Sequence, residues 1–157
     1  MRKSYPLFLL IALALLASGY IFGGASIALG INLPCLLIVL GISSAMSLSV
    51  SSAREITSYF REPFKSEDEA DRKILRNGEI FFRSLRYYFF LSGGIGTLTG
   101  VLILLSMVDS NEAIGLGMAI ALITLYYGMV FSLILAIPFE VATRKKLVET
   151  EPTKMLP

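Results

Sequence analysis

Four long apolar stretches, each free of Asp, Glu, Lys, Arg and His, constrain this 157-residue chain more than any other feature. A membrane-spanning helix needs about 20 apolar residues, because each backbone N–H and C=O inside lipid must bond within its own segment. The stretches are continuous and do not alternate with polar residues, which excludes a transmembrane barrel. The sequence therefore predicts an all-α membrane protein with four transmembrane helices, at residues 6–21, 33–49, 87–107 and 113–137.

The basic residues all fall on one side of this predicted membrane. Of the fourteen Lys and Arg residues, two precede the first stretch, eight lie between the second and third, and four follow the last. The other two connections carry none. Because basic residues gather on the cytoplasmic side, we expect both termini to be cytoplasmic. The first 19 residues also resemble a signal peptide, and its cleavage would leave three spans.

The order of elements divides the chain into four parts. Residues 1–50 hold the first two spans, 51–86 a short helical cytoplasmic segment, 87–138 a hairpin of the last two spans, and 139–157 a basic cytoplasmic tail. We expect residues 52–61 to continue the second helix into water until Pro63 breaks it. Ser66, followed by three acidic residues, marks the start of a new helix. Its apolar periodicity predicts one long helix that runs into the third span, while the fourth span ends at Pro138.

Two threonines lie in the hairpin, which turns at residues 109–112. Thr97 lies ten residues before Met107, and Thr124 lies eleven after Ala113. At about 1.5 Å per residue, both hydroxyls lie roughly 15 Å from the turn, near the middle of a core about 30 Å thick. A membrane threonine usually bonds the carbonyl four residues earlier in its own helix. Two hydroxyls at one depth also suit an ion path, since they bind Na⁺, water or a protonated acid.

The residue types exclude most catalytic chemistry. The chain has no His and a single cysteine, Cys35, so we predict no metal centre, no cofactor and no enzymatic activity. Ion translocation normally needs an ionisable group within the membrane, and the four apolar stretches provide none. Either the chain conducts nothing, or a partner supplies the carboxylate and this chain supplies the polar wall.

Sequence motifs in the hairpin are similar to those of a known family. The segments GGIGTLTG and IGLGMAIALIT, the LYYG that follows and Pro138 ten residues later resemble the last two membrane helices of flagellar stator A subunits (MotA and PomA). INLPCLLIVLG resembles the opening of that family's second helix. Together these motifs cover most of the membrane part. The chain is therefore identified as a member of the MotA/TolQ/ExbB proton-channel family.

This resemblance implies a function, an assembly and a set of site residues. Five copies would surround two copies of a MotB/ExbD-like single-span partner, whose membrane helix supplies an essential Asp. The complex would sit in the bacterial inner membrane and couple H⁺ or Na⁺ flow to rotation or other mechanical work. The resemblance also implies three groups of residues: Thr97 and Thr124 in the ion pathway, Pro138 in conformational coupling, and Gly93, Gly96, Gly100, Tyr127 and Gly128 in helix packing or pore lining.

The chain departs from the family pattern at three places. Leu125 replaces a second threonine typical of sodium-type stators, which favours protons as the coupling ion. Phe90 replaces a proline at the start of the third span. The cytoplasmic segment 51–86 is much shorter than the one that contacts a flagellar rotor. The sequence therefore does not assign the machine that the ion flow drives. An alternative function is a non-conducting membrane scaffold or assembly protein that retains the family's packing.

Overall fold

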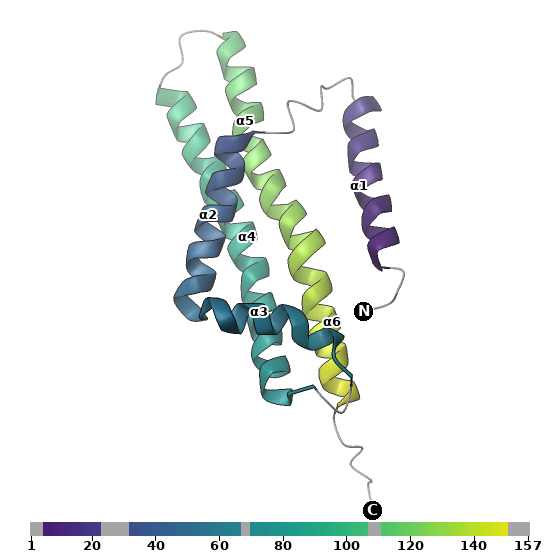
Figure 1. The fold of residues 1–157 in the computed structure, drawn as a ribbon. Helices are drawn as coiled ribbons and strands as arrows, with labels where there is room; N and C mark the ends of the chain where they lie inside the picture. Colours follow the sequence, from purple (N-terminus) through teal and green to yellow (C-terminus); the bar gives the residue numbers. More distant parts are fainter. Residues whose placement is uncertain (1–4, 23–31, 67–69, 107–110, 151–157) are drawn as a thin grey trace, which may run out of the picture.

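A computed structural model describes residues 5–22, 32–66, 70–106 and 111–150 of the chain. Within these ranges every regular element is a helix (Figure 1). The elements, in order, are α1 (Tyr5–Phe22), α2 (Leu33–Val50), α3 (Ala53–Arg61), η2 (Glu62–Phe64), α4 (Arg72–Ser106), α5 (Asn111–Phe131), η3 (Ser132–Ala136) and α6 (Ile137–Glu149).

Three of these helices are long and apolar enough to cross a membrane. They are α2, the 35-residue α4, and the continuous helix Gly117–Glu149 that α5, η3 and α6 form together. This confirms the all-helical fold and the last three of the predicted spans. The apolar part of α1, Leu10–Gly19, is shorter than these three helices, so a fourth span stays a prediction.

Helix α4 is the centre of the bundle, and it contacts α2, α3, α5 and α6. The core lies around its N-terminal half, where Phe82, Leu85 and Phe89 are buried. Aromatic side chains from three elements meet there: the ring centroids of Phe60 and Phe139 lie 5.0 and 5.3 Å from that of Phe82. Because α4 passes through this core without a break, the core also fixes the position of its C-terminal half relative to the neighbouring helices.

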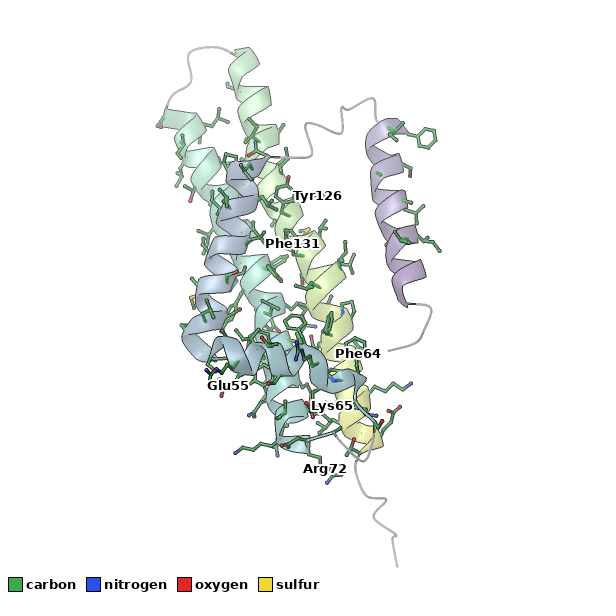
Figure 2. The ribbon with its side chains drawn as sticks, viewed as in Figure 1. Glu55, Phe64, Lys65, Arg72, Tyr126 and Phe131 are labelled. Carbon is green, nitrogen blue, oxygen red and sulfur yellow. The ribbon has the colours of Figure 1, made fainter. Side chains whose placement is uncertain are left out.

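The second span does not continue into the cytoplasm as predicted. Helix α2 ends at Val50, Ser51 is extended (φ −138°, ψ 140°), and α3 starts anew. A capping box makes this start: the Glu55 N–H donates to Ser52 Oγ at 3.4 Å, and the Ser52 N–H donates to Glu55 Oε2 at 2.8 Å. Helix α3 then crosses the bundle over α4 toward α6, and Figure 2 shows Glu55 and Lys65 on this crossing segment.

The capping box makes the start of α3 sensitive to pH. Hydrogen bonds from the Ser52 backbone and hydroxyl lower the pKa of Glu55 from its ordinary value of 4.5. Since the folded pKa is depressed, this contribution to stability is present above the ordinary pKa and is lost as pH falls through the folded one. We expect lower amide protection at the start of α3, relative to the intrinsic exchange rate at the same pH, once the pH falls below the ordinary pKa of Glu55. Hydrogen exchange on wild-type and Glu55→Gln chains checks this; an equal acid response in both would contradict it.

The long helix starts later than predicted. Ser66 lies outside any helix, residues 67–69 of the predicted start lie outside the described residues, and α4 begins at Arg72. Asp71 caps it instead, because its Oδ1 accepts the Lys73 N–H at 2.8 Å. The buried Glu62 fixes this cap in place, since its Oε1 accepts the Asp71 N–H at 2.7 Å. From Arg72 the helix runs uninterrupted to Ser106, as its periodicity predicted.

The last helix extends beyond Pro138, where the fourth span is predicted to end. It continues through a π-helical segment, η3, into α6, where Pro138 occupies the first turn. Proline has no N–H to donate to the preceding turn, and the π segment changes the hydrogen-bond pattern just before it. Asn111 and Glu112, which were predicted in the turn, already belong to α5, and residues 107–110 lie outside the described residues.

Candidate functional site

Helices α4 and α5 approach each other closely along a line of glycines. A Cβ atom added at Gly93 would lie 3.0 Å from the Thr124 carbonyl oxygen and 3.1 Å from Gly128 Cα. A Cβ added at Gly128 would overlap the Phe89 carbonyl oxygen. One at Gly100 would lie 3.0 Å from Ala121 Cβ. The backbones can meet this closely only because these positions lack side chains, which is typical of helix pairs in lipid.

The two threonines lie at one level of this helix pair, and their surroundings differ. Thr97 Oγ1 donates to the Ala121 carbonyl of α5 at 2.9 Å, so it bonds across the pair and not within its own helix. Thr124 is 2% exposed, and its methyl group fills the space beside Gly96. Thr97 stays partly exposed. The glycine packing thus brings both hydroxyl-bearing residues together, with Thr97 open on one side.

A groove of about 390 Å³ lies where α2, α4 and α5 meet. It is mostly apolar and includes Gly96, Gly100 and Thr124 but not Thr97. Its α2 side is formed by Cys35 and Ile38. Thr97 and this groove therefore lie on different sides of the α4–α5 pair.

Tyr127 fastens α5 to the start of α2. Its hydroxyl accepts the Asn32 N–H at 2.8 Å, and the Asn32 side chain caps α2 by accepting the Cys35 N–H at 3.2 Å. The Cys35 thiol lies 3.6 Å from the Ile120 carbonyl oxygen. Tyr127 thus contributes to helix packing within one chain, which is one of the two roles implied for it.

Pro138 lies in the first turn of α6, just after the π segment. Ser132 and Ala136 of that segment are buried. π-helical turns inside α-helices frequently occur at functional sites. Pro138 therefore follows an irregular turn within the continuous last helix.

Sequence reasoning missed two polar clusters. Ser43 and Ser92 are both buried, and their hydroxyls lie 3.1 Å apart across α2 and α4. Ser43 lies in a part of α2 that is rich in Ser and Ala, whereas nothing in the sequence indicates its partner Ser92 in α4. The second cluster joins Arg86 of α4 to Glu140 of α6, with Nη1 3.1 Å from Oε2, beside the buried Thr143. Nothing in the spacing of the chain pairs these residues.

The arrangement supplies hydroxyl and main-chain oxygens and no charge at membrane depth. Residues 87–107 and 113–137 contain no Asp, Glu, Lys, Arg or His. Among the described residues there is no cluster of His, Cys, Asp and Glu that could hold a metal ion. Because Thr97 gives its hydrogen to Ala121, its oxygen keeps lone pairs that can accept from water or a protonated acid, or bind Na⁺. This chemistry serves an ion path only together with a carboxylate from elsewhere.

Comparison with known proteins identifies the family. No curated protein matches the chain in sequence. The sequence model of the MotA/TolQ/ExbB proton channel family matches residues 39–154, which is most of the chain and includes the whole α4–α5 pair. A match of this extent, over the helices whose glycines and threonines form the site, shows that the chain belongs to the MotA/TolQ/ExbB proton channel family.

Proposed function

We propose that this chain is the A-subunit of an ion-driven motor or energy transducer of the bacterial inner membrane, most similar to the A-subunits of flagellar stators. The family supports ion-channel energy transduction. This proposal rests mainly on Thr97, a partly exposed residue at the level of Thr124. The surrounding stretches 87–107 and 113–137 contain no Asp, Glu, Lys, Arg or His. Such a wall requires a charged partner to move ions.

In this proposal five copies of the chain surround two copies of a MotB/ExbD-like single-span protein. The partner's intramembrane Asp faces the Thr97 side of α4. The Thr97 oxygen accepts a hydrogen bond from the protonated Asp, or ligates Na⁺, while Ala121 holds the hydroxyl in place. Leu125 removes one hydroxyl beside this position, which favours H⁺ over Na⁺.

The proposal includes a topology. Helix α1 forms the fourth span, and both termini lie in the cytoplasm with all fourteen basic residues. Helix α4 leaves the membrane near Arg86, so its first turns, α3 and α6 form the cytoplasmic part. The chain is not an enzyme and holds no cofactor; the transported ion is its substrate.

We expect Thr97→Val to lower proton-coupled flux by up to about tenfold, because a hydrogen bond between neutral groups is worth about 0.5–1.5 kcal/mol and 1.36 kcal/mol is a factor of ten. Thr99→Val is the matched control. Thr99 lies on the same helix, is exposed, and bonds only its own Ile95 carbonyl at 2.9 Å. Flux is measured in proteoliposomes of the purified complex under separate H⁺ and Na⁺ gradients.

Copurification gives an independent test of the proposal. We expect the chain to bring down a single-span protein with an Asp in its membrane helix. A closed homo-oligomer that admits no such helix would overturn the assignment. Equal flux in Thr97→Val and wild type under both gradients would remove the role of Thr97 and favour the non-conducting scaffold.

A further inference from the structure

A second polar cluster lies at the cytoplasmic end of the α4–α6 pair. Arg86 Nη1 of α4 lies 3.1 Å from Glu140 Oε2 of α6, and their side chains are 32% and 16% exposed. Thr143, one turn further along α6, is fully buried. Its methyl group faces Gly78 of α4, where an added Cβ would lie 3.5 Å away. The ion pair and the buried Thr143 thus lie one helical turn apart on α6, where it faces α4.

Two buried oxygens in this cluster lack a hydrogen bond. Glu140 Oε2 and Thr143 Oγ1 have no hydrogen-bond partner among the described residues. The short Arg86–Glu140 distance is an ion pair, but its geometry does not direct an N–H at Oε2. Buried polar atoms are nearly always satisfied, either by protein or by an internal water. Glu140 and Thr143 are three residues apart, so they are neighbours on one side of α6.

The charges around the cluster favour water over a metal cation as its occupant. The Arg86 guanidinium lies against the same Oε2 that a cation would use, and like charges at this distance repel. Glu79 of α4 and Arg144 of α6 form a further ion pair with 3.8 Å between Oε1 and Nε. Lys65, on the η2 segment packed against α6, is already paired with Glu62 at 2.8 Å. Water can donate one hydrogen to Glu140 and one to Thr143 without adding charge.

The cluster also lies on the same side of α4 as Thr97. Eleven residues separate Arg86 from Thr97, which is close to three full turns at 3.6 residues per turn. The two side chains therefore share a face of α4, roughly 16 Å apart along its axis. Along the internal α4–α5 contact the close approach of Gly93 and Gly128 leaves no room for solvent. Thr97 is bonded to α5 and Arg86 is paired with α6, so the shared face of α4 borders the last helix at both levels.

We propose that Glu140 and Thr143 hold an internal water beside Arg86, and that this water and the Glu140 carboxylate form the proton-release site on the cytoplasmic side. In the step, a proton from the Thr97 face passes to the water, which gives one of its protons to Glu140 Oε2. The carboxyl group then releases that proton to the cytoplasm and returns to the carboxylate paired with Arg86. No bond other than those to the proton changes. The transport part of this inference rests on the proposed function, whereas the water site does not.

The water site is tested on the purified full-length chain in lipid nanodiscs. X-ray hydroxyl-radical footprinting labels side chains that lie next to bound water, and we expect labelling of the peptide that contains Phe139 and Glu140. Thr143→Val keeps the side-chain volume but removes one of the two oxygens, so labelling should fall about threefold or more. Glu149→Gln is the control, because Glu149 is 41% exposed and pairs only with Lys145. Absence of labelling in the wild type, or equal labelling in Thr143→Val, would overturn the site.

The release role is tested with the copurified complex in proteoliposomes that contain a pH-sensitive dye. We expect Glu140→Gln, which keeps shape and removes the exchangeable carboxylate, to lower proton flux about tenfold or more. Glu149→Gln should match the wild type. Gel filtration of each variant complex confirms that it remains assembled, and Glu140→Asp should restore part of the flux if the carboxylate itself acts.

The outcomes separate this inference from the proposed function. Normal proton flux in Glu140→Gln overturns the release site and leaves the A-subunit assignment intact. Flux carried by Na⁺ alone also overturns the release site. A wild-type complex that carries neither ion overturns the proposed function, and with it the release role, while footprinting still decides the water site.

Discussion

Gly128→Ala should destabilise the chain by about 3 kcal/mol, the upper part of the range for overpacking a close contact. The new methyl group would overlap the Phe89 carbonyl oxygen, and it would also meet Gly93 Cα at 3.1 Å. Both neighbours are backbone atoms, so no side chain can rotate away. The helices must separate, which also breaks the Thr97–Ala121 hydrogen bond. Unfolding in mixed micelles with increasing SDS, followed by circular dichroism, measures the loss.

Two glycines of the same helices provide matched controls for this substitution. A Cβ at Gly94 in α4 or at Gly115 in α5 would meet nothing within 4 Å. Alanine is also the better helix former by up to about 1 kcal/mol, so Gly94→Ala and Gly115→Ala should be neutral or stabilising. A Gly128→Ala chain as stable as these controls would mean that α4 and α5 do not pack through their glycines.

Glu62→Ala should loosen the junction between α3 and α4 by about 2 kcal/mol, the scale of a hydrogen bond to a charged group. Glu62 is 1% exposed, accepts the Asp71 N–H at 2.7 Å, and pairs with Lys65 Nζ at 2.8 Å. Its loss removes the hydrogen bond that holds Asp71, the capping residue of α4, in place. At 1.36 kcal/mol per factor of ten, amide exchange in η2 and the first turn of α4 should accelerate about thirtyfold.

The comparison for Glu62 is Glu149→Ala. Glu149 forms an exposed ion pair with Lys145 at 3.7 Å within one helix, and such pairs are worth about 0.3–0.5 kcal/mol. Exchange near the α4 start should therefore stay at the wild-type rate in Glu149→Ala. If Glu62→Ala leaves that region equally protected, the buried carboxylate does not hold the junction together.

Much of the membrane part follows from the sequence, because the bilayer imposes a strict rule on backbone hydrogen bonds. The predicted span at 33–49 differs from α2 (Leu33–Val50) by one residue, and the long helix into the third span is present as α4. The glycines predicted for helix packing or pore lining lie at the α4–α5 contact. Periodicity and small residues report the membrane environment directly, so a single sequence is enough for these features.

The errors fall where a local side chain or a distant packing contact competes with the general pattern. The Ser52–Glu55 capping box starts α3 as a separate helix from α2. The residue types at this junction are also compatible with one continuous helix. Pro138 lies inside a helix because a π segment precedes it. No residue pattern in the sequence predicts that segment.

The threonines show the same limit at the site. Thr99 bonds its own Ile95 carbonyl, as expected for a membrane threonine, whereas Thr97 bonds Ala121 of the other helix. The difference arises because the glycines bring α5 within reach of one face of α4 only. It depends on the packing of two helices, which one sequence does not specify.

The unbroken length of α4 has a mechanical consequence. At 1.5 Å per residue its 35 residues make a rod about 52 Å long. The glycine contacts pack its membrane part tightly against α5, and the aromatic core packs its other half against α6. If the clamped assembly tilts by about 5° about one end, the far end moves by about 4.5 Å over that length. A small tilt of the membrane part would thus move the far end of α4 by about the size of a side chain. This displacement needs no additional hinge in α4.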